Sequence, residues 1–159
     1  MKIEYHSIGV VHSPFTQLKG MPIQPSGAKG IAGTVDVFPE FREGLKDLDG
    51  FSHIILLYHF HMVTERRLQV VPFLDTELRG LFATRAPVRP NPIGLTVVRL
   101  KGIQDGVLSV LDLDILDGTP VLDIKPYVAE FDGRTAVNMG WLENSLKQKR
   151  KTVSDDRFK

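Results

Sequence analysis

The residues best suited to chemistry lie in one segment, residues 82–94, which is rich in proline and arginine. Three prolines within six residues restrict its backbone at low entropic cost and exclude a helix or a central strand. Arg85 and Arg89 are held in this frame, and a guanidinium group is suited to bind a carboxylate or a phosphate. Because binding residues concentrate on loops held by rigid scaffolds, we predict a ligand-binding loop here.

A second candidate set consists of His53, His59 and His61. They share one parity on a predicted strand, so a regular strand would point all three to one side, where they could bind zinc. No acidic residue on that strand completes the set, and each histidine could instead pack against neighbours or reach solvent. We therefore expect no metal, and a metal-dependent hydrolase remains an alternative.

Four aspartates lie late in the chain, and each has an ordinary structural role open to it. Asp112 and Asp114 alternate with apolar residues and could simply face water. Asp117 precedes a glycine in a turn, and Asp123 shares a parity with Lys125, which allows a surface ion pair. Side-chain chemistry alone does not rank these four as catalytic groups.

Several classes of site are excluded by what the sequence lacks. The glycines of residues 27–33 have the wrong spacing for a dinucleotide-binding turn, and no phosphate-cradling loop or nucleophile elbow is present. The absence of cysteine excludes disulfides and thiolate metal sites and fits a reducing cytoplasm. A formal net charge of +1 excludes a strongly basic coat, so RNA binding would depend on a local patch.

The elements that must position these residues are mostly strands. The 159 residues, 42% of them hydrophobic, suit one domain with a sizeable core. No signal peptide or membrane span is visible. Many strands and few helices favour a mainly β fold, a barrel or a strongly curved sheet. We predict strands at residues 4–11, 34–38, 51–61, 80–84, 93–101, 111–115 and 121–124, and short helices at 40–48 and around 141–146.

Four motifs together resemble the tRNA methyltransferase O family. They occupy residues 8–15, 50–61, 82–94 and 117–127, so the resemblance covers most of the chain, and the last two motifs are long and specific. The resemblance implies a single-sheet β-barrel with short peripheral helices that works as a homodimer. It also implies methylation of N6 of threonylcarbamoyladenosine, the modified base beside the tRNA anticodon, with S-adenosylmethionine as cofactor.

The resemblance also implies which residues form the site. The cofactor pocket would be lined by Pro22, Ile23, Gln24, His61, Met62, Arg85, Leu95, Leu113 and Asp114. The substrate would lie near the segment that contains Asp117, Asp123, Lys125 and Tyr127.

Bacterial members of the family often carry a further C-terminal domain. We expect residues 1–159 to form a single barrel domain without it. The expected partners are the tRNA anticodon loop and a second copy of the chain, with no membrane, and the expected location is the cytoplasm.

The implied reaction needs alignment, a dry pocket and a proton acceptor, but no metal, because a sulfonium cofactor is already activated. The carbamoyl group makes the proton on the target nitrogen more acidic than that of plain adenine, so a modest base such as Asp117 or Asp123 would suffice. Arg89 suits the threonyl carboxylate in a bidentate pair. A second alternative is a non-enzymatic regulator that binds S-adenosylmethionine without transferring its methyl group.

Overall fold

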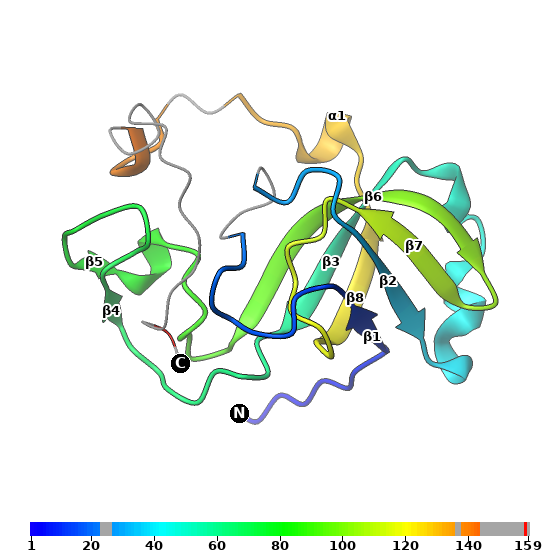
Figure 1. Ribbon diagram of the computed structural model, residues 1–159, viewed down its shortest axis with the longest axis horizontal. Coiled ribbons are helices and arrows are strands. Elements are labelled where there is room, and N and C mark those ends of the chain that lie inside the picture. The colour runs from blue at the N-terminus through cyan, green and yellow to red at the C-terminus, as the bar shows by residue number, and fades with distance from the viewer. Residues whose placement is uncertain (23–26, 136–137, 144–157, 159) are drawn as a thin grey trace.

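A computed structural model describes residues 1–22, 27–135, 138–143 and 158. Six antiparallel strands close into one barrel in the order β1-β2-β7-β6-β3-β8 (Figure 1), which confirms the predicted single-sheet β-barrel. A separate hairpin joins two shorter strands. The strands are β1 Gly9–His12, β2 Ala32–Val37, β3 His53–His59, β4 Gln69–Val70, β5 Arg79–Gly80, β6 Ile93–Gln104, β7 Val107–Leu111 and β8 Pro120–Pro126.

Strand β3 is central in the barrel wall, as its apolar sequence predicts. It pairs with β6 along its whole length and with β8 on its other side. Ile54, Leu56 and Tyr58 point into the barrel and are buried. Ile55 and Leu57 point outward and are half-buried. The outer face of this strand is therefore also apolar, which explains apolar residues at both parities.

The β6–β7 hairpin was not predicted from the sequence. Its turn is Asp105-Gly106, where both residues have positive φ, +51° and +84°, as a tight two-residue hairpin requires. Strand β7 then ends at Leu111, because Asp112 also takes a left-handed conformation with φ +68°. The strand predicted at residues 111–115 is therefore wrong beyond its first residue.

Residues 113–116 nevertheless follow the predicted alternation, since Leu113 and Ile115 are fully buried. Here the chain leaves the sheet and crosses one end of the barrel. The Leu113 amide donates to the carbonyl of Ile31 at 3.2 Å, and the Ser13 hydroxyl donates to the carbonyl of Ile115 at 2.7 Å. The segment closes that end of the core.

Three other predicted elements differ from the structure. The first strand begins at Gly9 rather than at residue 4. The predicted helix at 40–48 consists of two 3-10 helices, Pro39–Leu45 and Leu48–Gly50, separated by Asp47 at φ +65°. In place of the strand predicted at 80–84, β5 ends at Gly80 and a 3-10 helix spans Leu81–Ala83. The helix predicted around 141–146 lies largely outside the described residues.

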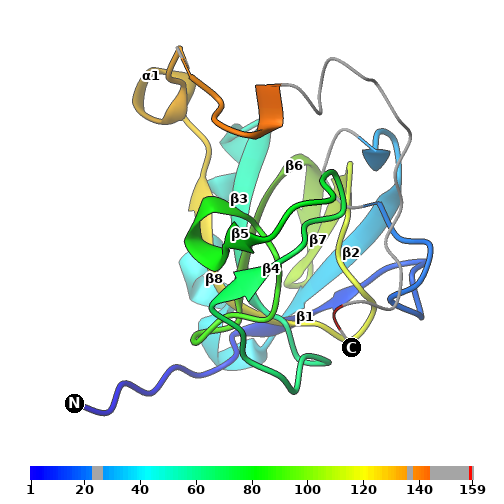
Figure 2. The ribbon, with the colours of Figure 1, turned by 90° about the vertical axis from the view of Figure 1, so that its left-hand side faces the viewer.

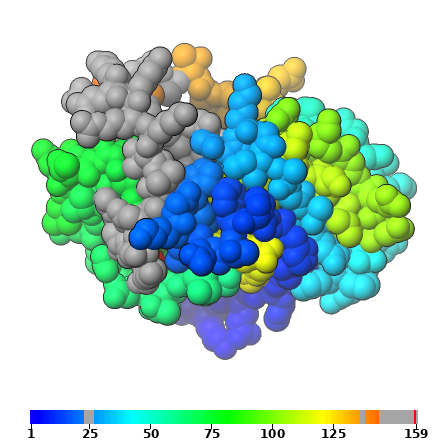
Figure 3. Space-filling model, viewed as in Figure 1, coloured from blue at the N-terminus to red at the C-terminus, as the bar shows by residue number. Residues whose placement is uncertain are grey.

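The β4–β5 hairpin lies beside the barrel rather than in its wall (Figures 1 and 2). A second apolar cluster joins it to the following loop and includes Val70, Leu81, Ala86, Val88 and Phe158. In Figure 3 the blue N-terminal residues lie between the green segment that holds this hairpin and the yellow-green β6–β7 hairpin. The helix α1, Ala129–Asp132, follows β8, and no helix in the described part of the chain is long and apolar enough to cross a membrane.

Candidate functional site

The proline-rich segment predicted to bind a ligand is a tightly bonded loop. The Thr84 hydroxyl donates to the Leu81 carbonyl at 2.8 Å and accepts from the Ala86 amide at 3.2 Å. Arg89 closes the loop, since its Nη1 donates to the carbonyl oxygens of Thr84 at 3.0 Å and Ala86 at 3.4 Å. Val88 is fully buried and anchors the loop on the second apolar cluster. These contacts restrict the loop in addition to its prolines.

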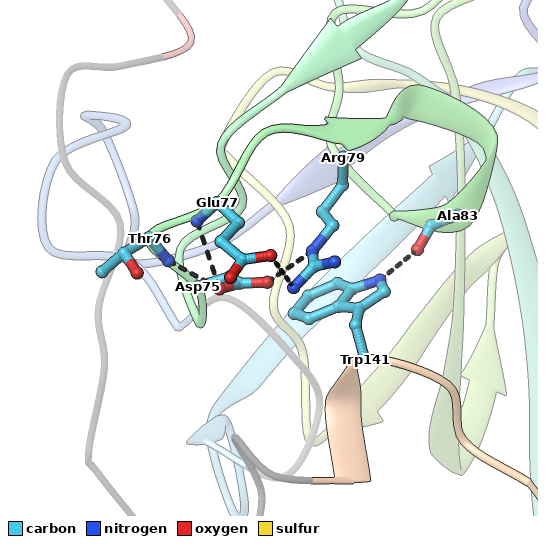
Figure 4. Close-up of polar contacts among 6 residues, drawn as sticks. All are labelled: Asp75, Thr76, Glu77, Arg79, Ala83 and Trp141. Carbon is cyan, nitrogen blue, oxygen red and sulfur yellow. Dashed lines mark hydrogen bonds and ion pairs between the residues drawn. The ribbon is translucent and has the colours of Figure 1, made fainter.

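A second set of contacts holds the start of the same loop. Nε1 of Trp141 donates to the Ala83 carbonyl at 2.8 Å, and the Arg79 guanidinium carbon lies 5.9 Å from the centre of the tryptophan ring (Figure 4). Asp75 holds Arg79 through an Oδ2–Nε bond of 2.7 Å, and Glu77 lies 2.9 Å from Nη2 of the same arginine. Residues distant in sequence thus fix the position of the Ala83 carbonyl.

The two arginines of the loop have different surroundings. Arg85 is exposed and makes no hydrogen bond or ion pair with any residue that the structure describes. Arg89 is half-buried, and its guanidinium carbon lies 5.7 Å from the centre of the Phe82 ring. Arg85 is therefore available to a ligand, whereas at least one nitrogen of Arg89 is already committed to the loop.

Strands β3, β6 and β8 meet at one end of the barrel, where β3 ends and the other two begin; we call this the site end. His59 pairs with Ile93, and Tyr58 pairs with Gly94 on one side and Val121 on the other. A Cβ atom on Gly94 would lie 2.3 Å from the Tyr58 ring. The absence of a side chain at Gly94 is therefore what lets the buried tyrosine lie across β6.

Of the two possibilities left open for Asp114, the structure shows a largely buried carboxyl group at the site end rather than one that faces water. Burial raises the pKa of its carboxyl group, while Thr96, its own amide and Arg85 act in the opposite direction. Asp114 Oδ1 and Thr96 Oγ1 are both buried without a hydrogen-bond partner of acceptable geometry among the described residues. Burial also raises the pKa of Tyr58, Asp114 adds to this, and Arg85 opposes it.

Asp114, Thr96, Tyr58 and Arg85 therefore form a polar cluster with hydrogen-bonding capacity left over. Buried polar atoms are nearly always paired in native proteins, so unpaired ones mark a place where a ligand or water belongs. The cluster combines two predicted cofactor residues with Tyr58 and Thr96, which sequence reasoning missed. Strand parity indicates that both point inward, but no local signal shows that they meet Asp114.

His61 lies just beyond the end of β3, close to the start of β8. Its Nδ1 is 3.3 Å from Oγ1 of the buried Thr119. Burial, and to a lesser degree His59, lowers the pKa of His61 and so favours the neutral ring. Met62, the next residue, is 53% exposed. Both predicted cofactor residues thus lie at the site end.

The remaining residues of the predicted cofactor set are more scattered. Pro22 is half-buried, and Ile23 and Gln24 lie outside the described residues. Leu113 is fully buried in the barrel core, and its amide is bonded to the Ile31 carbonyl. Leu95 points to the outer face of the barrel and is 49% exposed, on the opposite side of β6 from Thr96.

Asp117 lies at the site end, beside the end of β1. Its Oδ1 accepts a hydrogen bond from the Ser13 amide at 3.0 Å and is 3.7 Å from Nδ1 of His12. The adjacent Gly118 has φ +75° and donates to the carbonyl of Val11, so the predicted turn is confirmed. The carboxyl group of Asp117 is therefore held in place with one oxygen engaged.

Asp123, Lys125 and Tyr127 follow β8 away from the site end. Asp123 Oδ2 and Lys125 Nζ are 2.7 Å apart, which confirms the predicted ion pair. The Tyr127 amide donates to the carbonyl of His53, at the start of β3, and the two rings are 6.3 Å apart. Asp117 thus lies at the site end near β1, whereas Asp123, Lys125 and Tyr127 lie progressively farther along the chain from it.

The three histidines that suggested zinc do not come together. His53 and His59 occupy opposite ends of β3, which at the rise of a strand places them roughly 20 Å apart. His61 contacts Thr119 instead. In the described ranges no group of three or more histidine, cysteine, aspartate or glutamate side chains is arranged to hold a metal ion.

Relatives of this chain include proteins named for S-adenosylmethionine binding and for tRNA methylation. A probable S-adenosyl-L-methionine-binding protein of Pyrococcus abyssi is 56% identical over 158 residues, which cover 99% of this chain and 86% of the relative. The tRNA (adenine(37)-N6)-methyltransferase of Escherichia coli is 38% identical over 79% of this chain, and the match covers 57% of that enzyme.

The fold has solved counterparts as well. A crystal structure of TrmO from Pseudomonas aeruginosa superposes with a TM-score of 0.74 at 39% identity, covering 89% of this chain. This chain spans 63% of the length of that solved chain. The family model for the tRNA-methyltransferase O N-terminal domain matches residues 10–133, well over half of the sequence. The chain belongs to the tRNA-methyltransferase O family.

Proposed function

We propose that this protein is a methyltransferase that transfers a methyl group from S-adenosylmethionine to N6 of an adenine in tRNA. The observation that carries the proposal is the polar cluster at the site end, where Asp114 Oδ1 and Thr96 Oγ1 are buried without a partner among the described residues and Arg85 is exposed. Family membership supplies the reaction type, since relatives that share most of this chain are named for this activity or for binding this cofactor.

The polar cluster fits the charged groups of S-adenosylmethionine. An ionised Asp114 can accept hydrogen bonds from an ammonium group, and Arg85 can pair with a carboxylate. Thr96 Oγ1 offers a further donor or acceptor. His61, Met62 and Pro22 complete the pocket. When bound, this cofactor supplies an electrophilic methyl group, so the protein itself needs only to align the reactants, exclude water and accept a proton.

Asp117 is the better placed of the two candidate proton acceptors. It lies at the site end, held through one oxygen by the Ser13 amide. Asp123 lies farther along β8, where it is paired with Lys125, and its other carboxylate oxygen accepts a hydrogen bond from the Ile124 amide at 2.9 Å. Both oxygens of Asp123 are thus engaged, whereas Asp117 keeps one oxygen without a hydrogen bond from the described residues. We assign Lys125 and Tyr127 to substrate contacts outside the reacting centre.

For the substrate we propose threonylcarbamoyladenosine, the modified base beside the anticodon. Its carboxylate requires a cation, and we assign this role to Arg89 of the proline-rich loop, since Arg85 is assigned to the cofactor. Because the anticodon loop is single-stranded, its bases can be splayed out and read by their edges.

We further propose that the protein is a homodimer that acts in the cytoplasm, where tRNA is modified. The outer face of β3 and β6 carries a ladder of apolar side chains: Ile55 pairs with Val97 and Leu57 with Leu95. The side chain of Ile93, opposite His59, is 39% exposed at the end of the same ladder. A continuous outward apolar strip on paired strands is typical of an interface between subunits.

Two measurements test the proposed function. Isothermal titration calorimetry should show binding of S-adenosylmethionine that persists with a chelator present, because no metal takes part. Mass spectrometry of tRNA nucleosides after incubation with the cofactor should show a new N6-methylated adenosine. Loss of binding on chelation would revive the histidine-metal hydrolase, and tight binding without methyl transfer to any RNA would indicate a regulator.

A further inference from the structure

The loop that carries the two arginines also exposes an aromatic side chain that the proposed chemistry does not use. Phe82 is 76% exposed, although its neighbour Leu81 is fully buried. Exposed single apolar residues are common on proteins, but this one is held in a fixed position. It belongs to a 3-10 turn whose carbonyls are bound by Thr84 and Trp141.

Arg89 sets the surroundings of the Phe82 ring. Its guanidinium carbon lies 5.7 Å from the ring centre, within the range of a cation–π contact. The same guanidinium group is fixed by the carbonyl oxygens of Thr84 and Ala86. Ring and cation are therefore fixed relative to each other before any ligand binds, which reduces the entropy lost on binding.

The other flank of the turn is held by the contacts drawn in Figure 4. Trp141 binds the carbonyl of Ala83, the residue after Phe82, and Arg79 lies over the tryptophan ring. Asp75 in turn fixes Arg79. A hydrogen-bonded turn that presents an exposed ring, three residues from Arg85, which has no ion-pair partner among the described residues, is suited to a flat, anionic ligand.

We propose that Phe82 and Arg89 form a stacking platform for a nucleobase of single-stranded RNA, next to the base that is methylated. The inference rests on the proposed function and deepens it, because it names a contact with the substrate loop. Unstacked bases of RNA loops stack on aromatic rings and on arginine planes, and nearby cations bind the phosphates between them. This contact gives affinity without a strongly basic surface, which agrees with a net charge of +1.

The first test compares Phe82→Leu with Phe82→Trp in binding to a fluorescently labelled anticodon stem-loop RNA. Leucine keeps the apolar bulk but loses the ring, so the Kd should rise about five- to a hundredfold, whereas tryptophan should retain binding. Phe131→Leu is the matched control, because Phe131 is 70% exposed on α1 and should leave the Kd unchanged. Calorimetry should show unchanged S-adenosylmethionine binding in all three variants.

The second test detects the stack directly. The wild-type chain has one tryptophan, so its fluorescence provides the background for Phe82→Trp. Addition of the stem-loop should quench the new tryptophan beyond any change in the wild type. Wild-type RNA binding that Phe82→Leu leaves unaltered, or no added quenching, overturns the platform alone. A wild-type protein that binds no tRNA or stem-loop overturns both the platform and the proposed function.

Discussion

Oδ1 of the Asp114 carboxyl group is buried without a hydrogen-bond partner among the described residues. This burial has opposite effects on the stability of the cofactor-free protein and on cofactor binding. Its pKa is raised in the folded protein, mainly by burial. The folded state therefore binds the proton more tightly than the unfolded chain does, and stability contributed by this group falls as pH rises through the folded pKa. An ammonium group next to the carboxylate would favour its ionised form and so offset the free-energy cost of burying that charge.

We therefore expect Asp114→Asn to weaken S-adenosylmethionine binding about tenfold or more while leaving the cofactor-free protein at least as stable at neutral pH. Calorimetry measures the first effect and thermal unfolding the second. In the wild type, cofactor binding should weaken as pH falls through the Asp114 pKa, and the variant should lack this dependence. Equal cofactor affinity of the wild type and Asp114→Asn would show that Asp114 does not contact the cofactor.

The two arginines of the proline-rich loop should separate in their effects. Arg85→Ala should raise the Kd for S-adenosylmethionine about 10- to 100-fold, because a charge-assisted hydrogen bond is lost, with little change in Tm since Arg85 makes no described contact. Arg89→Ala should instead lower Tm by a few degrees and weaken tRNA binding, since it leaves the Thr84 and Ala86 carbonyls without their donor. Identical profiles for both variants would contradict this division.

At the scale of the elements, Asp112 joins the glycine-containing loop before β2 to strand β6. Its carboxylate accepts two hydrogen bonds from Arg99, at 2.5 and 3.0 Å, and one from the Gly30 amide at 2.6 Å. Arg99 first, and then Gly30, lowers the pKa of Asp112 to about 2. Because this is below the ordinary value of 3.8, the stabilisation is present above about pH 4 and is lost as pH falls toward 2.

Asp112→Asn should accordingly lower Tm by a few degrees at pH 7 and make the decrease in Tm between pH 4 and pH 2 shallower. Asparagine tolerates the φ of +68° at this position, so the backbone itself is not strained. Thermal unfolding followed by circular dichroism across pH measures both effects. A variant whose pH dependence matches the wild type would show that the Arg99 pair contributes nothing.

The apolar ladder on the outer face of β3 and β6 predicts how the dimer is disrupted. Leu95→Glu places a charge on that face without entering the core, and size-exclusion chromatography with light scattering should then report a monomer. Leu68→Glu is the control, because Leu68 is 69% exposed but lies outside the ladder. A wild-type protein that is itself monomeric would refute the dimer, and the cofactor affinity of Leu95→Glu tests whether Leu95 also belongs to the pocket.

The sequence predicted those elements whose signals are local. The prolines of the loop indicated its stiffness, and the apolar run of β3 indicated a central strand. Asp105-Gly106 is an equally local hairpin signal that was not used, and it would have placed β7. The end of β7 was not predictable by alternation, because the left-handed Asp112 keeps the alternating burial while taking the chain out of the sheet.

The site was less accessible to sequence reasoning because its members come from separate strands. The resemblance indicated Arg85 and Asp114, which the barrel does bring together. Tyr58 and Thr96 join them only through the register of β3 and β6, and the glycine at position 94 that admits the tyrosine ring has no local signal for that role. Asp123 is the opposite example: it lies in a specific motif of the sequence, but its partner in the structure is Lys125, two residues along the same strand.

At the scale of the whole molecule, the proposed substrate predicts that the threonylcarbamoyl group is added to the tRNA before the methyl group. A cation placed for a threonyl carboxylate has no partner on unmodified adenosine, and the plain adenine N6 proton is less acidic. Methylation should therefore be at least on the order of a hundredfold slower on an unmodified transcript than on the same tRNA carrying the threonylcarbamoyl group. Liquid chromatography with mass spectrometry compares the two. Equal rates would rule out the carboxylate contact and leave a tRNA methyltransferase of another specificity.

The barrel wall is closed, but the pairings between its neighbouring strands differ in length. β3 and β6 share a ladder along the whole of β3, whereas β1 and β8 share only two residue pairs, Gly9 with Val121 and Val10 with Pro120, and the proline has no amide to donate. Local opening is easiest where contacts are fewest, so we expect the wall to separate first at the β1–β8 pairing, which is flanked by hydrogen bonds from the Ile8 and Val11 amides. This pairing lies next to Thr119 and Asp117, so its opening would widen the end of the barrel at which we propose that a splayed-out base enters and leaves.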